Sequence, residues 1–564
     1  MKSWQKNTVQ LLLILILIIL VNIFTSSIFF RFDLTSEKRH TLSKTTREHL
    51  RQIKSPIYVR IYLDGDLPVG FVRLKKYVTE MLTEMNIHSN NKIKFSIINP
   101  HEIKGNKEKQ NFFNDLMKQG VKPTNVQIRD KKDRYSQLLI FPSAIASYKS
   151  KSNVINFLEN NPALSSEVNF NHSVENLEFN LITSFKKLIT EEKKRIAFIE
   201  GHGELDEFEV ADITKELSEI FHIDRVTIKG NNEILNSYDA IIIAKPVYAY
   251  PEEDKFVVDQ YIMNGGKALW LIETTTAEMD SIAQKGSAFS IIRDINLNDQ
   301  LFKYGVRINP TLVQDIQCAI IPVNTSMTGS SSEFVPAPWP YSPLIIASQN
   351  HPVSRNLSMI KTEFVNSMDT LVNEGVHKTI LLKSSEYTRV KSVPTLIELS
   401  EVDQNLSHAL FTNKPEILGV LLEGRFNSVF KNRIISGYMK NKSEFKEGSE
   451  YTKMIVLSDG DIIKNNVRQR AGGRIIEPLG YDRYSNQTFG NKNFIINSIH
   501  YLCDESGFIE LRSRELKMRV LDKVKITNQR LKWQVINTLI PSLLVVILGL
   551  TVVLMRKRKF TSFL

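Results

Sequence analysis

Four polar side chains have the types and positions that acid–base or cation-binding chemistry requires. His202 and Glu204 occur in the Gly-His-Gly-Glu segment 201–204, and Asp459 and Asp461 flank a glycine further along the chain. An imidazole among carboxylates can transfer protons, and the same groups can hold a cation. The alternative is structural: the glycines beside His202 favour a tight turn, and Asp459 turns or caps the chain before Ile462. We favour the structural interpretation.

Catalytic motifs of the common kinds are absent from the chain. There is no G-x-x-x-x-G-K-[ST] loop for ATP hydrolysis and no G-x-S-x-G nucleophile elbow. The dinucleotide fingerprint G-x-G-x-x-G is also missing, because the segment 201–203 lacks the third glycine. No C-x-x-C, H-E-x-x-H or paired Cys/His spacing indicates a zinc site. We therefore expect no catalytic residue, no metal, no cofactor and no enzymatic activity.

Predicted strands immediately precede the four polar residues. The apolar segments 195–200 and 454–457 end just before them, and 238–244 and 267–272 give two further buried strands separated by a helix. Strands and helices alternating at this spacing predict a doubly wound, mostly parallel, Rossmann-like α/β domain over 193–505. Ligands of such sheets bind beyond the carboxyl ends of the strands, so the four residues have a suitable position.

A smaller α/β domain is predicted over 31–190. A strand at 56–63, a helix at 71–87 and a strand at 92–98 form a βαβ pattern that is compatible with a thioredoxin-like fold. The redox cysteine pair of that fold is absent, so a redox role has no support. The chain has only Cys318 and Cys503, for which a disulfide is permitted outside the cytoplasm but not implied.

A proline-rich stretch interrupts the large domain. Four prolines occur within residues 336–343, and proline is excluded from helix interiors and central strands. This composition predicts a long loop that holds Trp339 in a stiff frame. Trp339 then either binds a partner or packs onto its own domain.

Apolar stretches at the two ends of the chain predict transmembrane helices over 9–30 and 533–555. The second stretch has no charged residue and is long enough to cross a hydrocarbon layer of about 30 Å. The four cations that open the tail 556–564 place that tail in the cytoplasm. The first stretch also fits a cleavable signal, but it has no A-x-A site and turns apolar again at 28–30, which favours an uncleaved span. We expect the bacterial inner membrane, both termini in the cytoplasm and the bulk in the periplasm.

Polar residues of the second span are the expected partner contacts. Asn537, Thr538 and Ser542 are costly to leave facing lipid, whereas a neighbouring helix can accept their hydrogen bonds. A membrane-proximal helix over 508–532, with an apolar stripe among basic residues, needs a covering surface as well. The net charge of +12 is concentrated in this region and in the tail, and no basic run is interleaved with aromatic residues. We therefore expect no nucleic-acid partner.

Short motifs along the chain resemble one known family. The segments at 33–43, 201–204, 422–426, 458–461, 490–494 and 512–533 are similar, in order and spacing, to those of GldG, the gliding-motility ABC-transporter auxiliary protein family. The resemblance implies an auxiliary subunit required for gliding, with the permease and the ATPase on separate chains. It also implies kinship with a module of an intraflagellar transport subunit and of sugar-associated enzymes. The alternative is an extracytoplasmic protein that binds or hydrolyses a glycan or small ligand at the sheet's carboxyl edge.

Overall fold

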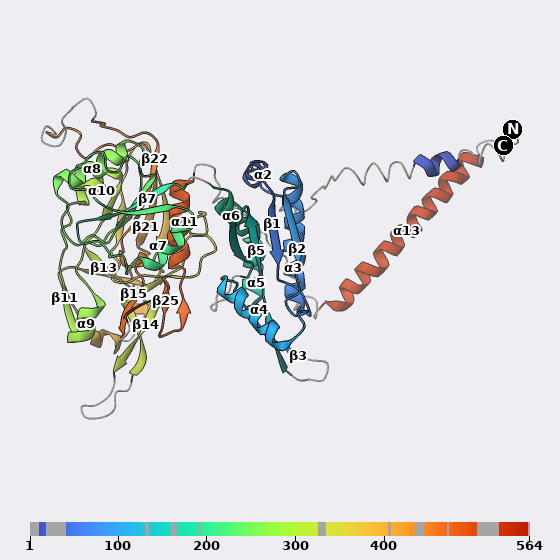
Figure 1. Cartoon of the computed structure of the whole chain (residues 1–564), viewed down its shortest axis with the longest axis horizontal. Coiled ribbons are helices and arrows are strands. Elements are labelled where there is room, and N and C mark those ends of the chain that lie inside the picture. Colours follow the sequence, from blue (N-terminus) through green and yellow to red (C-terminus); the bar gives the residue numbers. More distant parts are fainter. Residues whose placement is uncertain are drawn as a thin grey trace. The chain divides into compact units, whose positions relative to one another are not determined.

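The chain divides into two compact units, residues 1–514 and 515–564 (Figure 1). The structure is a computed structural model, and it describes residues 11–17, 41–129, 135–158, 166–190, 193–324, 334–403, 406, 408–434, 445–470, 473–504 and 529–561. The first unit contains a smaller N-terminal sheet and a large mixed sheet, each with its own helices.

The N-terminal sheet has the strand order β2-β1-β5-β6. β1 (Ile57–Ile61) alternates buried and exposed residues, and it pairs in parallel with β2 (Ile93–Ile97). α3 (Val69–His88) connects them and buries one face at helical spacing through Leu74, Val78, Leu82 and Met85. The strand, helix and strand thus occupy the residues where the sequence pattern predicts them; the thioredoxin-like assignment stays a prediction.

The remaining elements of this part complete the sheet, pack beside it or, as β3 and β4, form a separate two-stranded sheet. Ser43 caps the first of its helices, since its hydroxyl accepts the Thr46 amide hydrogen at 3.0 Å. The segment around Pro142 forms two strands, because the proline has no amide hydrogen to continue the ladder. The elements are α2 (Lys44–Arg51), α4 (Asn106–Lys118), β3 (Thr124–Arg129), β4 (Tyr135–Ile140), β5 (Ser143–Tyr148), β6 (Lys151–Asn156), α5 (Ser166–Glu175) and α6 (Leu177–Ile189).

The large sheet has the order β12-β17-β21-β22-β10-β9-β7-β8, with β18 paired to β21. Five neighbouring strands run parallel: β8 (His222–Thr227), β7 (Arg195–Glu200), β9 (Ala240–Ala244), β10 (Lys267–Leu271) and β22 (Thr452–Leu457). The other four pair antiparallel: β12 (Val306–Ile308), β17 (Met368–Thr370), β18 (Val376–Lys383) and β21 (Ile417–Gly424). The sheet is therefore more mixed than predicted, because β21 pairs antiparallel with β22, β17 and β18.

Helices cover both faces of the parallel strands, and the period-two pattern of β7 shows why. Ile196 and Phe198 belong to one core with residues of α7 (Ala211–Ser218) and α11 (Asn491–Cys503). Ala197 and Ile199 belong to the other core with residues of α8 (Glu252–Met263) and α10 (Asn298–Tyr304). Successive side chains point to opposite faces, so a strand buried on both faces must be apolar throughout.

A β-rich subdomain forms around a third core, and it includes the proline-rich stretch. Residues 334–345, which contain the four prolines, form a long strand rather than the predicted loop. β15 is the middle strand of a three-stranded sheet, but its pairing with β16 is confined to Leu344 and Ile345, so the prolines at 336–340 lie outside that pairing. The elements of the subdomain are α9 (Met279–Lys285), β11 (Ser287–Ser290), β13 (Thr311–Asp315), β14 (Cys318–Asn324), β15 (Phe334–Ile345), β16 (Ile360–Lys361), β19 (Thr388–Ser392) and β20 (Thr395–Glu398).

The second unit consists, in its described part, of the long helix α13 (Arg530–Thr561). Its segment 530–558 is apolar and long enough to cross a membrane. No residue of its most apolar stretch is buried by the described part of the protein. Of the first apolar stretch, residues 11–17 are helical and the rest lies outside the described residues, as does nearly all of the predicted helix over 508–532. Small strands β23 (Val467–Arg470), β24 (Gly473–Ile476), β25 (Tyr481–Asp482) and β26 (Gln487–Thr488) complete the fold.

Candidate functional site

A buried lysine and three carboxyl groups lie together where three neighbouring parallel strands end. Lys245 follows β9, Glu273 lies two residues beyond β10, and Asp459 and Asp461 follow β22. The Lys245 Nζ atom lies 3.1 Å from a Glu273 carboxylate oxygen and 2.6 Å from an Asp461 carboxylate oxygen. We call these four residues the lysine cluster. It lies at the carboxyl edge of the sheet, where the sequence places Asp459 and Asp461.

Backbone amides complete the hydrogen bonds of the carboxylates in the lysine cluster. Asp459 accepts hydrogen bonds from the amides of Glu363 at 2.9 Å and Asp461 at 2.7 Å, and Glu273 accepts one from Gly460 at 3.1 Å. A Cβ atom on Gly460 would lie 2.5 Å from Cβ and Cγ of Lys245. The close approach of Lys245 to this turn therefore requires glycine at position 460.

The electrostatics of the lysine cluster follow from burial, from one ammonium among three carboxyl groups, and from the Arg293 guanidinium, which lies 3.7 Å from Glu273. Burial raises the pKa of Glu273 to about 7 and raises the pKa of Asp459 well above its usual range. Burial acts in the same direction on Asp461, but the Lys245 ammonium outweighs it and lowers the pKa of that carboxyl. Burial alone would lower the pKa of Lys245, yet Asp461 and Glu273 raise it. Lys245 and Asp461 thus form the charged pair, while burial shifts Glu273 and Asp459 toward their neutral forms.

The three carboxyl groups of the lysine cluster also meet the distance requirement of a metal site. One oxygen from each of Glu273, Asp459 and Asp461 lies within 4.8 Å of the others. However, the Lys245 ammonium is already bonded to two of them, and it supplies the positive charge that a cation would bring. A metal ion would have to displace this ammonium, so the cluster is closed to metals while Lys245 is in place.

His202 forms a second polar cluster, built around a ring with two carboxylate partners. Its Nδ1 atom lies 3.0 Å from Glu204, and its Nε2 atom lies 2.9 Å from Asp254 of α8. The ring stacks on Tyr250 with centroids 3.6 Å apart, and the Tyr250 hydroxyl donates to Glu204 at 2.7 Å. We call these four residues the histidine cluster. Only 4% of His202 is exposed, so the imidazole is not the exposed group that a simple turn would present.

The two carboxylate partners of His202 determine its protonation. A neutral imidazole has one N–H, whereas an imidazolium has two and can donate to both carboxylates. Burial opposes the charge, but hydrogen bonds and Coulomb attraction from Glu204 and Asp254 raise the pKa of His202. Burial would likewise raise the pKa of Glu204, but His202 and Tyr250 lower it. Because carboxylates face both ring nitrogens, the site favours the protonated ring over the neutral one.

The structure therefore pairs the four residues chosen from the sequence in two separate clusters. His202 contacts Glu204, and Asp461 donates to Asp459, but no contact joins the two pairs among the described residues. Sequence reasoning missed Lys245 and Glu273, and it also missed Tyr250 and Asp254. Lys245 and Glu273 follow buried strands just as His202 does, so the same strand-end rule would have identified them.

Trp339 and the polar residues of α13 are the predicted partner contacts. Trp339 is 2% exposed and packs with Tyr341 in the core of its own subdomain, which is the second of the two roles considered for it. In α13, the Thr538 and Ser542 hydroxyls donate to backbone carbonyls of their own helix at 2.7 and 2.8 Å. Asn537 is exposed and has no hydrogen-bond partner among the described residues.

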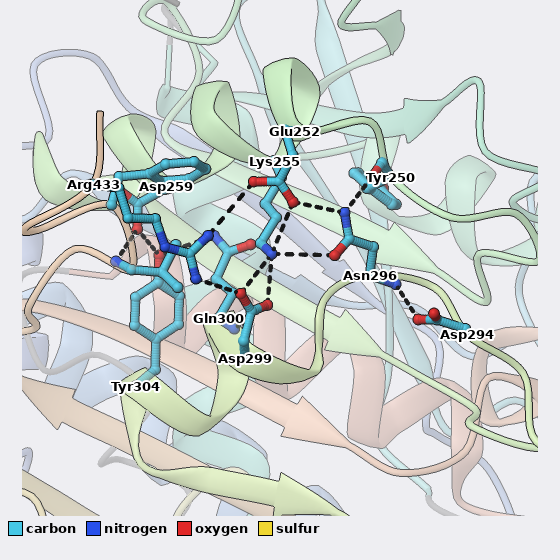
Figure 2. A network of polar contacts seen from close by, with 12 residues as sticks. Tyr250, Glu252, Lys255, Asp259, Asp294, Asn296, Asp299, Gln300, Tyr304 and Arg433 are labelled. Carbon is cyan, nitrogen blue, oxygen red and sulfur yellow. Dashed lines mark hydrogen bonds and ion pairs between the residues drawn. The ribbon is translucent and has the colours of Figure 1, made fainter. Parts of the chain in front are cut away.

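A third polar network surrounds the fully buried Lys255 on α8 (Figure 2). The Lys255 Nζ atom lies 2.6 Å from Asp299 and 3.5 Å from Glu252, and it donates to the Asn296 amide oxygen at 3.3 Å. Arg433 pairs with the same two carboxylates, at 2.9 Å from Asp299 and 3.5 Å from Glu252. Through these ion pairs, Arg433 links the segment between β21 and β22 to Glu252 of α8 and Asp299 of α10.

The cavity identified in the large domain lies away from all these clusters. It has a volume of about 370 Å³ and is lined at the amino ends of β9 and β10, by residues such as Tyr238, Asp239 and Lys267. Asp239 already accepts a hydrogen bond from the Arg195 amide there, at 2.9 Å. At the carboxyl edge of the sheet, by contrast, the charged groups of the lysine and histidine clusters are paired with one another.

The chain is similar to known proteins and matches two family models. An uncharacterized protein of Borreliella burgdorferi is 22% identical over 573 residues, which cover 99% of this chain and 100% of that protein. The mmIFT52 N-terminal domain is similar to 55% of this chain over 97% of its own length, with a TM-score of 0.31 and 13% identity. A domain model of unknown function matches residues 36–147. The family model described as an ABC-type uncharacterized transport system matches residues 193–498, and the chain belongs to this family of transport-system auxiliary proteins.

Proposed function

We propose that the chain is a non-catalytic, membrane-anchored auxiliary subunit of an ABC transporter whose permease and ATPase are separate chains. The observation that carries this proposal is the helix α13, whose apolar segment is long enough to cross a membrane and is left uncovered by the described residues. Membership in the transport-system family points to the partner, and an uncovered apolar helix supplies a means of reaching it in a membrane.

The closed polar clusters support a non-catalytic role. A general acid or base must reach a substrate proton directly or through one water, with a hydrogen-bonding position to spare. Both ring nitrogens of His202 are bonded to carboxylates, and Lys245 lies between Glu273 and Asp461. Each candidate group is thus already satisfied by its neighbours, and these contacts hold strand ends together.

The membrane topology in this proposal has two spans in the bacterial inner membrane, with both termini in the cytoplasm and the bulk in the periplasm. It is supported by α13, by the apolar stretch 9–30 and by the cations at 556–559. Protease added to the outside of spheroplasts is expected to digest the middle of the chain and to leave two short anchored ends. An intact middle part would refute this topology.

Asn537 is the residue of α13 that most needs a partner helix. Its carboxamide has no partner among the described residues, and Pro541 cannot donate the backbone hydrogen bond that the Asn537 carbonyl would accept. Two unsatisfied polar groups in one helical turn are costly in hydrocarbon, and a neighbouring transmembrane helix can satisfy them. We infer that the permease supplies that helix.

The experiment that tests the proposal is affinity purification of the full chain from detergent-solubilised membranes. Permease and ATPase subunits are expected to co-purify, and they should be lost when residues 533–555 are replaced by an unrelated apolar span that still inserts. Recovery of the chain without any transporter subunit would refute the proposal. The resemblance to GldG extends the proposal to a transporter that serves gliding motility, for which the test is the spreading of a deletion strain.

A further inference from the structure

The strand β2 (Ile93–Ile97) is an open edge of the N-terminal sheet. In the described fold β1 is the one strand that pairs with it, and their register runs unbroken, without a bulge or a proline. Sheets commonly protect such an edge with prolines, bulges or charged side chains. The single charged residue of β2 is Lys94, whose Nζ atom lies 5.9 Å from the centre of the Tyr58 ring in β1. Its ammonium is thus held over the sheet rather than across the free edge.

The ladder between β1 and β2 determines which backbone groups reach that edge. Alternate residues of a strand direct their amide and carbonyl to the same neighbour. The Ile98 amide donates to the Ile61 carbonyl of β1 at 2.8 Å, so the even-numbered residues of this stretch face β1. The odd-numbered residues, Phe95 and Ile97 among them, therefore direct their amides and carbonyls to the free edge.

Four of these outward groups have no partner. The Ile93 amide donates to the side-chain oxygen of Asn86 at 3.1 Å, so this donor is already used. The amides and carbonyls of Phe95 and Ile97 form no hydrogen bond with any other residue that the structure describes. Two donors and two acceptors in alternation are the pattern that an added strand satisfies.

The side chains of β2 also show that the sheet ends early. On one face, all three residues of β1 are buried. The residues opposite them in β2 become steadily more exposed: Ile93 is buried, Phe95 is half-buried and Ile97 is 37% exposed. A further strand beyond β2 would extend this apolar face and cover Phe95 and Ile97.

A second copy of β2 fits this edge in one antiparallel register. When Ser96 lies opposite Ser96 of the second copy, Phe95 lies opposite Ile97 on both sides of the centre. Each of these two pairs exchanges two hydrogen bonds, so the four bonds use all the free groups of both copies. A register centred on Phe95 would instead need the Ile93 amide, which is bonded to Asn86.

The side chains agree with the register centred on Ser96. Each Phe95 meets an Ile97, and an aromatic residue opposite a β-branched one is a favourable cross-strand pair. The two Lys94 residues are offset by four positions, about 14 Å along the strands, so no like charges face each other directly. The strand is therefore complementary to itself in backbone, shape and charge.

We propose that two copies of the chain associate through β2, antiparallel about Ser96, and so join their N-terminal sheets into one. A pair of five-residue strands buries less than the roughly 1,200 Å² of a stable soluble complex. The membrane anchoring of the proposed function, on which this inference rests, compensates for the small area. Confinement of both copies to one bilayer raises their effective concentration.

The test is oxidative cross-linking of the full chain with Ser96→Cys in its own membranes. At a non-hydrogen-bonded antiparallel pair the two Cα atoms lie about 4.5 Å apart, within the range of a disulfide. The matched control is Lys94→Cys, which is exposed on the same face of the same strand but too far from its counterpart to be bridged. Cys503 is buried, and burial raises the pKa of the Cys318 thiol to about 12, so the native thiols contribute little background.

A proline at position 97 tests the backbone pairing separately. Ile97→Pro, combined with Ser96→Cys, removes an amide that faces the free edge and leaves the ladder with β1 intact. Two hydrogen bonds of the dimer are lost, so the yield of covalent dimer should fall about tenfold or more. Ile97→Val keeps the amide and should keep the yield. Equal resistance to trypsin will show that the variants are folded.

The covalent dimer is expected from Ser96→Cys and not from Lys94→Cys. Equal yields from the two variants, no dimer from either in membranes that retain the chain, or a yield unchanged by Ile97→Pro would refute the pairing through β2. Protection of the Ser96→Cys thiol from maleimide without a dimer would show that another protein covers the edge, which also overturns the proposal. Extraction of the chain by alkaline carbonate would refute the membrane anchoring instead.

Discussion

Replacement of Lys245 by methionine is the most informative single perturbation of the carboxyl edge. Methionine keeps an unbranched apolar side chain of similar length but removes the ammonium from Glu273 and Asp461. Breaking a buried ion pair by removing one partner typically costs about 3–5 kcal/mol, because the other charge stays buried without compensation. Against a typical folding stability of about 5–15 kcal/mol, this loss is large.

The expected loss depends on pH, and the sign follows from the carboxyl groups that remain. Burial raises the pKa of Glu273 to about 7 even with the lysine present, and loss of the ammonium raises the carboxyl pKa values further. The folded variant then binds more protons than the unfolded chain, so its stability falls as pH rises, by up to about 1.4 kcal/mol per pH unit for each proton. The difference between Lys245→Met and the parent chain should therefore grow between pH 6 and pH 8.

The assay is hydrogen–deuterium exchange of peptides from β9, β10 and β22 in the full chain, which reports local opening free energies in a multidomain protein. Lys285→Met, an exposed position on α9, is the control and should change protection by less than about 0.5 kcal/mol. Adding Asp461→Asn to Lys245→Met should restore part of the loss, because it removes the unpaired carboxylate. A loss below 1 kcal/mol, or one that does not change with pH, would refute the reasoning.

Three further predictions concern the histidine cluster, the α8 network and the span. The stability of the parent chain should fall as pH rises above about 6.5, the pKa of histidine in the unfolded chain. The pKa of His202 is raised in the folded chain, so its contribution to stability is complete below about 6.5 and is lost as the ring deprotonates. His202→Gln should remove this pH dependence in the same exchange assay. Asp299→Asn leaves the buried Lys255 poorly paired, so proteolysis within 425–451 should accelerate, whereas Asp280→Asn should have no effect. Asn537→Leu should keep insertion but weaken permease co-purification about threefold, matching about 0.6 kcal/mol per interhelical hydrogen bond; unchanged recovery would exclude this contact.

The parts of the fold that could be predicted are those where one strong local signal determines the structure. The strand β9 is an unbroken apolar run between a turn and a lysine, and burial of all five residues follows from its composition. The strand β15 was missed because the proline rule excludes central positions, whereas its register places prolines in outward-facing pairs. Register is a property of two segments, so the local sequence could not determine it.

The candidate site divides in the same way. His202 and Glu204 are two residues apart in the sequence, so their contact follows from the local turn. Asp254 is 52 residues from His202, and its contact depends on the tertiary fold. Lys245 and Asp461 are 216 residues apart, and they meet only because β9 and β22 flank the same strand, β10. Sequence reasoning gave the edge of the sheet correctly but could not give the strand order, and strand order decides which charged groups meet.

The closed charges at this edge also determine what the large domain can bind there. A ligand that recruits Lys245 must first separate it from Asp461, and one that recruits His202 must leave Glu204 or Asp254 unpaired. Either separation costs about as much as breaking a buried pair, about 3–5 kcal/mol, which lowers affinity by a factor of about 150 to 5,000. The same contacts connect β9 to β22 across β10, and β7 to α8, so they stiffen the sheet that carries the subdomain around Trp339. In the proposed auxiliary role, a sheet stiffened in this way presents a fixed surface to the partner subunits.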